Sequence, residues 1–299
     1  MAKAGLSQAQ MRQLICFLFT LPALAVVFVF FLLPMLRALF LSFTNWDGIA
    51  RTYRWIGLNN FKVVVTDSTF RQITFNTLFL AIIYVPVLNV VALLLAVGVY
   101  NAGKLGNVYK AMLFFPNLLS MTVIGMIWNI IYGYKGLLNQ FLKAVGLKLL
   151  MQDWLGQVNT VLPATSMTII WFAVGYYLLI YLAGLNTVPV EIYESAEVEG
   201  VSARQKLFRI TIPLIAPSIT INAVLSTIGI ITLFDLPFVL TQGGPGFKSQ
   251  TIAMQVYAYA FQQLRTSYAL ALAVILGVFA ILITSLQLRF FRRREEASR

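Results

Sequence analysis

Charged residues divide this chain into six long uncharged stretches, and this division limits the fold more than any other feature of the sequence. Each stretch has at least 23 residues, more than the roughly 20 apolar residues with which an α-helix crosses a bilayer. Lipid offers no partner to a free N–H or C=O group, so we expect these segments to be helices. The stretches are 13–36, 72–103, 111–134, 154–190, 210–234 and 266–288.

The composition of the 299 residues agrees with a membrane protein. Hydrophobic residues make up 60% of the chain and charged residues only 11%, whereas soluble domains are about 25% charged. We predict an all-α integral membrane protein with a transmembrane domain over 14–291 and six spans. The expected helices are 14–41, 74–99, 111–132, 162–185, 214–234 and 268–290.

Several of the expected helices carry proline. Each proline removes a backbone hydrogen bond and tends to bend its helix. Such bends can act as gates in a transporter, and they are also tolerated in lipid without any function, so both interpretations stay open. The prolines are Pro22, Pro34, Pro86, Pro116 and Pro217.

Basic residues are denser in one set of connecting segments than in the other. One set holds 12 Lys and Arg in 63 residues, and the alternate set holds 9 in 92. Because cytoplasmic loops carry the excess of Lys and Arg, we expect both termini to be cytoplasmic. The cytoplasmic segments are then the N-terminus 1–13, the turn 100–110, the loop 186–213 and the end 289–299, which includes the basic tail 292–299.

Several classes of function are excluded by what the sequence holds and lacks. The net charge of +12 does not indicate nucleic-acid binding, because the basic residues flank apolar runs and form no stripe. The chain has no histidine, and its one cysteine, Cys16, cannot form an internal disulfide or a metal cluster by itself. The segment 242–249 superficially resembles a phosphate-binding loop, but Phe247 stands where glycine is required before Lys248. We therefore expect no ATP hydrolysis and no cofactor in this chain.

A charged island, residues 191–209, lies between the fourth and fifth expected helices. A charged side chain at the bilayer centre costs about 3 kcal/mol, so the island lies outside the membrane. Residues 191–200 are expected to form a short helix that follows Pro189 and has acidic first turns, which the helix dipole favours. Ala196 and Gly200 share a small face that allows another surface to approach closely. From the residues alone, a solvated loop is an equal alternative.

The island resembles the EAA signature loop of the permease subunits of bacterial binding-protein-dependent ABC importers. Its pattern is Glu194-Ser195-Ala196, then Gly200, then Ile210-Thr211-Ile212-Pro213, and Ser195 replaces the usual alanine. Other segments resemble the carbohydrate-uptake group in the same order along nearly the whole chain, and the last of them, Leu240–Pro245, points to the MalF/UgpA type. They are Trp55–Phe61, Gly136–Asn139, Leu182–Leu185 with Val188-Pro189, and Leu240–Pro245.

The resemblance implies the MalF-like fold of type I importers, with six spans in the bacterial inner membrane and the island as a cytoplasmic coupling helix. The implied partners are a second homologous permease subunit, two ATPase subunits that bind ATP and Mg, and a periplasmic or lipid-anchored substrate-binding protein. Closure of the ATPase dimer would pull the coupling helix and swing the spans between two states. The implied coupling residues are Glu194, Ser195, Ala196, Glu197, Gly200 and Arg204.

A cargo site is expected between the fourth and fifth helices, where aromatic and hydroxyl groups gather. Counting from Glu194, several residues match positions that line the sugar site of the maltose-type permease, although that permease has amides where Ile230 and Leu233 stand. Ordinary packing between helices is the alternative for each residue. The candidates are Phe172, Tyr176, Tyr177, Asn222, Ser226, Gly229, Ile230 and Leu233.

Two other classes of protein fit the sequence less well. An ion-coupled secondary transporter usually carries acidic residues within its spans, and none lies well inside an expected helix here. An intramembrane enzyme would need histidine or clustered carboxylates. The sequence therefore indicates an ATP-driven importer of a sugar or related carbohydrate, and it does not name the cargo.

Overall fold

The computed structural model describes residues 8–297, apart from the side chains of Gln10 and of residues 292–297. Parts of the expected N-terminal segment 1–13 and of the basic tail 292–299 therefore lie outside the described residues. The described chain is a set of helices joined by turns and loops, with one isolated antiparallel bridge between Thr44 and Trp55.

Four helical runs are long and apolar enough to cross a membrane, and two bent helix pairs raise the number of candidate spans to as many as six. The first run continues from α1 (Gln8–Val27) through a π-helical turn (Phe28–Leu32) into α2 (Leu33–Leu41). The other three are α4 (Ser68–Asn101), α8 (Val161–Leu185) and α15 (Thr266–Ala297). A short helix, α3 (Asn59–Thr66), precedes α4.

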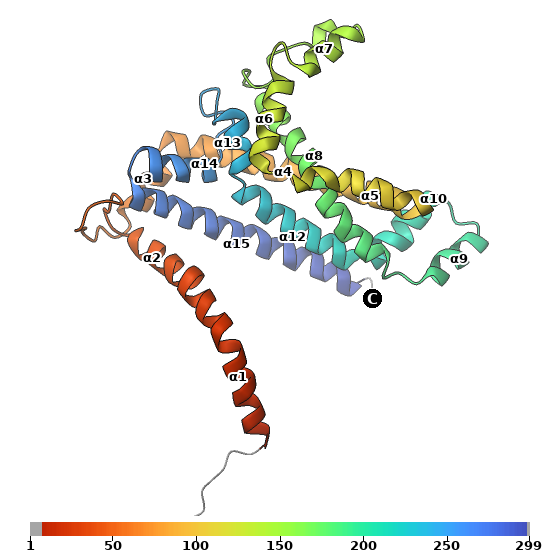
Figure 1. The fold of residues 1–299 in the computed structure, drawn as a ribbon, viewed down its shortest axis with the longest axis horizontal. Coiled ribbons are helices and arrows are strands. Elements are labelled where there is room, and N and C mark those ends of the chain that lie inside the picture. Colours follow the sequence, from red (N-terminus) through yellow and green to blue (C-terminus); the bar gives the residue numbers. More distant parts are fainter. Residues whose placement is uncertain (1–7, 298–299) are drawn as a thin grey trace, which may run out of the picture.

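The helix expected over 111–132 is broken instead. α5 (Gly106–Phe114) ends in a 3-10 turn, Phe115–Leu118, and α6 (Met121–Tyr132) begins only after Ser120. The two arms of this pair meet at 96°. Pro116 lies in the turn, where the missing N–H and the ring oppose a continuous helix. α7 (Leu137–Ala144) then projects beyond α6, at the top of Figure 1.

The helix expected over 214–234 is also preceded by a bend. α12 (Ala216–Thr232) meets the preceding arm at 75°, and Pro217 occupies its first turn. That arm comprises α10 (Ala203–Gln205), a π-helical segment (Lys206–Thr211) and α11 (Ile212–Leu214). Beyond α12 the chain forms α13 (Asp235–Thr241), α14 (Ile252–Tyr257) and a π-helical turn (Ala258–Gln262) before α15.

The core of the bundle is built around α8, which packs against α4, α5 and α12. Two glycines allow these close approaches. A Cβ atom on Gly175 would meet the carbonyl oxygen of Leu113 and lie 2.7 Å from the Cα of Phe114. A Cβ on Gly184 would meet the hydroxyl of Ser218 on α12. Small residues of this kind let membrane helices approach through their backbones, where packing supplies much of the attraction.

The first helical run stands apart from this bundle. No residue of its apolar window, within Met11–Leu41, is buried in the chain. Figure 1 shows α1 pointing away from the other helices, with α2 as its attachment. A helix with apolar residues on all sides belongs in lipid or against another membrane helix, and the described chain leaves this run uncovered.

Polar side chains fix the end of the bundle at which α4 begins. Asp67 caps α4 by accepting the N–H of Thr69 at 2.8 Å, and its second oxygen accepts the hydroxyl of Tyr259 at 3.0 Å. Burial acts to raise the pKa of the Asp67 carboxyl, but these hydrogen bonds outweigh it and lower the pKa below the ordinary 3.8. Nearby, the buried amide of Asn76 donates to the carbonyl oxygens of Phe247 and Gln250, each at 2.8 Å. The glycine-rich loop after α13 is thereby held against α4.

Candidate functional site

The charged island does contain a helix, α9 (Val190–Val198). It begins after Pro189 and has Glu191 in its first turn, as the sequence predicts. The chain leaves α9 through Gly200, whose φ of +69° lies in the left-handed region that favours glycine. The N–H of Val201 reaches back to the carbonyl of Ala196 at 3.0 Å and closes the helix end.

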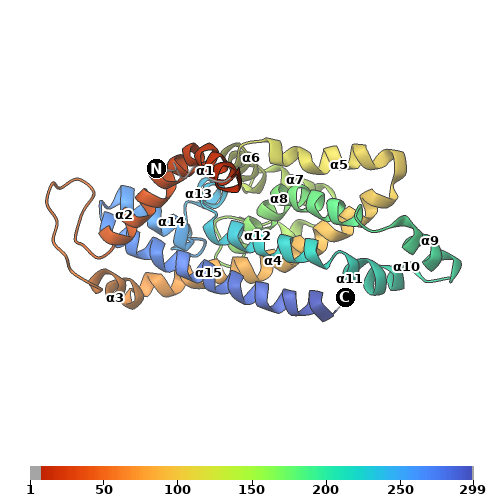
Figure 2. The ribbon, with the colours of Figure 1, turned by 90° about the horizontal axis from the view of Figure 1, so that it is seen from below.

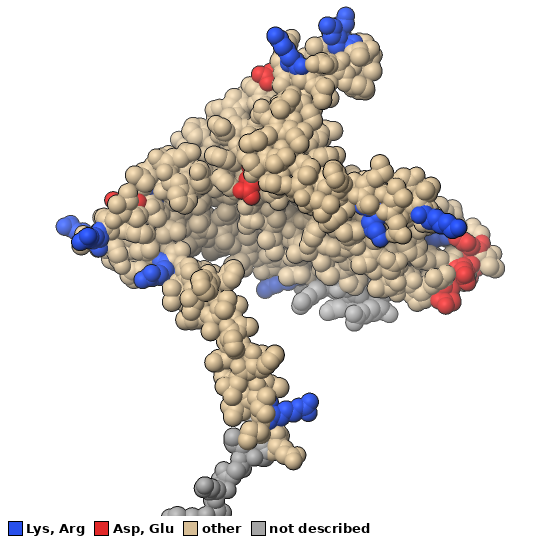
Figure 3. Space-filling model, viewed as in Figure 1, with Lys and Arg blue, Asp and Glu red and all other residues tan. Residues whose placement is uncertain are grey.

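α9 lies at one end of the molecule, beyond the ends of α8 and α12. Figure 2 shows it together with α10 at the tip opposite α3. Three residues separate α8 from the Pro189 cap, so any displacement of α9 acts directly on α8. A group of acidic side chains lies at this tip, as the space-filling view shows (Figure 3). α9 is therefore an exposed, charged element with a short connection to the bundle.

The predicted coupling residues differ in their environment. Ala196 is the buried one, with 4% of its surface exposed, and it holds α9 against its own chain. Nothing lies within 4 Å of a Cβ placed on Gly200, so its small size is not required by packing inside this chain. Close packing of a partner there stays a prediction. The exposed residues of the set are Glu194, Ser195, Glu197, Gly200 and Arg204.

An ion pair joins α9 to the returning chain. The ammonium of Lys206 contacts the carboxylate of Glu197, the one such pair among the side chains that the structure describes, and lies 5.9 Å from the ring centre of Tyr193. The Glu197 side chain is 68% exposed, so the pair adds little stability. A cavity of about 430 Å³ lies behind α9, and Tyr100 of α4 and Tyr193 are among the residues that line it. Glu194 also lines this cavity and forms no ion pair within the described chain.

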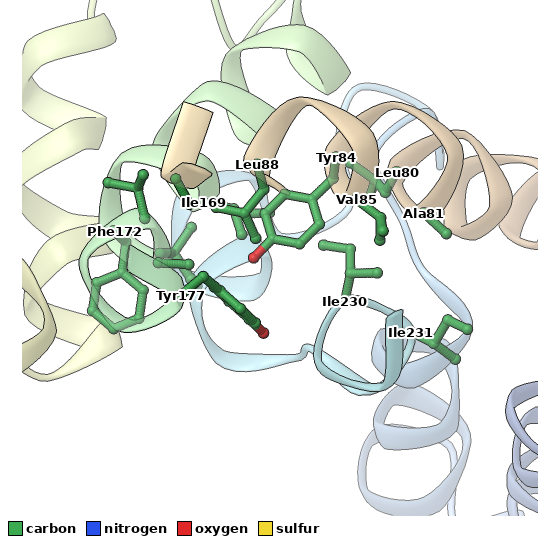
Figure 4. Packing of buried hydrophobic residues seen from close by; sticks show 14 of the residues in the cluster. Leu80, Ala81, Tyr84, Val85, Leu88, Ile169, Phe172, Tyr177, Ile230 and Ile231 are labelled. Atoms are coloured by element: carbon green, nitrogen blue, oxygen red, sulfur yellow. The ribbon is translucent and has the colours of Figure 1, made fainter. Parts of the chain in front are cut away.

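Most of the predicted cargo residues line a second cavity, of about 230 Å³, between α4, α8 and α12. Figure 4 shows Tyr84 of α4 beside Tyr177 of α8, close to Ile230. The described residues that line this cavity include no charged side chain, and hydroxyl and amide groups supply its polarity. Tyr176 is 46% exposed, so the cavity opens at the surface of the chain. The predicted residues that line it are Phe172, Tyr176, Tyr177, Gly229, Ile230 and Leu233.

The structure does not bring the other two predicted cargo residues, Asn222 and Ser226, to the cavity wall. Both are fully buried in α12 and face neighbouring helices. The Asn222 amide donates to the carbonyl of Tyr177 at 3.0 Å, and the Ser226 hydroxyl donates to the carbonyl of Asn222 at 2.6 Å. Asn222, Ser226 and Gly229 follow one another at intervals of three to four residues, so they lie on one side of α12. Of these three, only Gly229 reaches the cavity, because other helices pack over Asn222 and Ser226.

Two polar residues of the cavity are not predicted from the sequence. Tyr84 lies in the middle of α4, and Asn117 lies in the turn between α5 and α6. The Asn117 amide donates to the carbonyl oxygen of Phe172 at 2.5 Å. The sequence does hold a signal for Asn117, because this amide directly follows Pro116 within an expected span, and interrupted membrane helices commonly line binding sites.

The structure is thus a bundle of membrane helices with an aromatic cavity at its surface and a short charged helix at one end. The chain belongs to the family of binding-protein-dependent transport system inner membrane components, which it matches over residues 75–296. It is therefore a multi-pass permease of an importer that depends on a substrate-binding protein.

Named relatives agree with this assignment over nearly the whole chain. The probable ABC transporter permease protein YurN of Bacillus subtilis is 31% identical, over 95% of this chain and 98% of that protein. The multiple sugar-binding transport system permease protein MsmF of Streptococcus mutans is 30% identical, over 93% and 95%.

Solved structures show the same fold. A bacterial ABC transporter involved in import of the acidic polysaccharide alginate matches with a TM-score of 0.78 at 22% identity, over 95% of this chain and 96% of that chain. The same kind of transporter in complex with an alginate pentasaccharide-bound periplasmic protein matches with a TM-score of 0.80, at the same identity and coverage.

Proposed function

We propose that this permease moves a carbohydrate into the cytoplasm, and the observation that carries the proposal is the cavity between α4, α8 and α12. Its wall combines aromatic rings with hydroxyl and amide groups and includes no charged side chain. Sugars present apolar faces and hydroxyl edges, and such a wall complements both. The names of several relatives agree, among them a multiple sugar-binding system and a lactose system. Membership of a binding-protein-dependent family decides against the ion-coupled alternative.

The proposed energy source is a pair of ATPase subunits that bind ATP and Mg and grip α9. Support comes from the position of α9, which is exposed, begins directly after Pro189, is closed at its C-terminal end by the hydrogen bond from Val201 to Ala196, and is connected to both α8 and α12. A displacement of α9 acts on the two helices that carry most of the cavity wall. Alternating access then follows from rigid movement of these helices. Glu194, Ser195 and Glu197 present exposed polar groups for this contact. The Glu194 carboxylate forms no ion pair with the described side chains and can accept a basic residue of a partner.

A second, homologous permease is the proposed partner within the membrane. The run α1–α2 leaves its apolar surface uncovered by its own chain. The cavity also opens beside the exposed Tyr176, so a second subunit would close it. The basic bias of the connections supports cytoplasmic termini, which places α9 in the cytoplasm and α3 and α7 on the side of the binding protein.

The test begins with the substrate-binding protein of this importer. Its thermal stability is measured with lactose, maltotriose and alginate oligosaccharides as probes, and a bound sugar is then followed into liposomes that contain the complete transporter. Uptake that requires both ATP and the binding protein, and that vanadate stops, supports the proposal. Uptake driven by a proton or sodium gradient without ATP would contradict it.

A further inference from the structure

A second polar layer lies just below the cavity, on the side of α9. Asn89 is five residues past Tyr84 on α4, and Tyr181 is four residues past Tyr177 on α8. Each step corresponds to about 6–8 Å along a helix. Ser226 lies three residues before Gly229 on α12, which runs in the opposite direction. Three helices thus bring polar groups to one level, between the cavity and the coupling helix.

The side chain of Asn89 holds this layer together. Its Nδ2 donates to the carbonyl oxygen of Val85 at 2.8 Å and to the hydroxyl of Ser226 at 3.0 Å. Its Oδ1 accepts the hydroxyl of Tyr181 at 2.8 Å. One amide therefore joins α4 to both α8 and α12 and uses donor and acceptor together, a combination that neither an ionised carboxylate nor an apolar residue can reproduce.

The hydrogen bonds of Asn89 matter because the polypeptide does not join α4 directly to α9. α8 and α12 are linked to each other through α9 and the segment that follows it, so a movement of α9 reaches both. α4 packs against α8 and α12, and it meets α9 through a ring contact in which the centres of Tyr100 and Tyr193 lie 6.2 Å apart, but it is not part of that linkage along the polypeptide. Between helices in lipid the hydrophobic effect supplies no attraction, and an apolar contact alone can slide. α4 nevertheless contributes Tyr84 to the cavity wall.

We propose that Asn89 is a positioning residue of the transport cycle, which ties α4 to α8 and α12 so that the cavity wall and the coupling helix move as one body. This inference rests on the proposed function of α9. Asn89 does not touch the cavity; it acts through Tyr181 and Ser226. The same hydrogen bonds also carry the effect of a docked binding protein from the cavity wall to α9, and through α9 to the ATPase.

The experiment uses the complete transporter with its binding protein in liposomes, and MgATP hydrolysis is the readout. Asn89→Leu removes all three hydrogen bonds at similar volume, and Tyr181→Phe removes only one hydroxyl. The matched control is Thr165→Val, because the buried Thr165 hydroxyl donates to Val161 of its own helix. Asn89→Leu should lower the stimulation by the binding protein about sevenfold, equal to about 1.2 kcal/mol or two average hydrogen bonds between membrane helices. Tyr181→Phe should lower it about threefold, the value of one such bond.

Three further results are expected if Asn89 acts as a tie. Hydrolysis without the binding protein is unchanged in Asn89→Leu, Thr165→Val behaves as wild type, and the double variant Asn89→Leu with Tyr181→Phe equals Asn89→Leu alone. Should Asn89→Leu fail to assemble, Tyr181→Phe carries the test. Normal stimulation in the assembled variants, an equal loss in Thr165→Val, or additive losses in the double variant would overturn the role of Asn89. A wild-type transporter without any stimulation would instead overturn the proposed function.

Discussion

The substitution Gly200→Asp separates what α9 needs for its own folding from what it needs for contact with a partner. Gly200 has a φ of +69°, and the position of a Cβ is open, with nothing within 4 Å. An aspartate there introduces strain of about 1–2 kcal/mol, the cost of a left-handed conformation for an L residue. No clash inside the chain adds to this value. The permease should therefore fold, insert and lose only this amount of stability.

A matched control lies in the turn between α4 and α5. Gly103 has a φ of +54° and equally open surroundings, and it is expected on the same side of the membrane. Gly103→Asp should cost the same strain of about 1–2 kcal/mol and leave uptake intact. Gly200→Asp should abolish uptake, because the new carboxylate stands where the ATPase packs against α9.

The assay compares three quantities for both variants: the amount of protein in the membrane, the thermal unfolding of the purified transporter, and ATP-dependent uptake into liposomes. Equal unfolding temperatures with uptake lost only in Gly200→Asp would agree with a contact surface at α9. Normal uptake by Gly200→Asp would refute the coupling role, and so would an equal loss of uptake in Gly103→Asp.

Three further predictions address the cavity, the packing of α8 and the capped end of α4. Tyr176→Ala should weaken the apparent affinity for the transported sugar by about 0.5–1.5 kcal/mol, the value of one stacking contact on an aromatic ring. Unchanged uptake kinetics would remove Tyr176 from the cargo site. Gly175→Ala should destabilise the protein by about 1–3 kcal/mol through overpacking, because its Cβ meets the backbone of α5. The control Gly277→Ala, whose Cβ has nothing within 4 Å, should melt as wild type. Equal melting temperatures of the two variants would show that α5 and α8 do not pack as described. Because the folded protein lowers the pKa of Asp67, this carboxylate stabilises the fold above its unfolded-state pKa, and the stabilisation is lost as the pH falls through its folded-state pKa. Wild type should therefore lose an increment of stability below about pH 4 that Asp67→Asn lacks. Parallel profiles of stability against pH for the two proteins would contradict this.

The helices that could be predicted from the sequence are those with a clear chemical start and stop. α8 runs over Val161–Leu185, close to the expected 162–185, because it lies within an uncharged stretch and charged residues follow soon after it. α9 was expected because Pro189 and the glutamates after it suit a helix start, and Gly200 suits a helix end. These signals are local, so they do not depend on the rest of the fold.

The bends and the inward faces were harder to predict. Proline alone does not announce a break: α4 passes through Pro86 as one helix, whereas the chain bends by 96° near Pro116. Membrane helices are also apolar on all sides, so hydrophobic periodicity does not show which face is buried. For this reason the sequence indicates Asn222 and Ser226 as cavity residues although they pack between helices, and it gives no signal for Tyr84.

Photo-crosslinking at Ser195 tests whether α9 docks onto an ATPase subunit in the cytoplasm. A photoreactive amino acid replaces Ser195, which is exposed on α9. In a second variant it replaces Phe247, which is expected on the far side of the membrane and whose side chain is also exposed. Illumination of the intact membrane should join position 195 to the ATPase subunit and position 247 to no cytoplasmic protein. Absence of an ATPase adduct at position 195, or an ATPase adduct at position 247, would contradict the account.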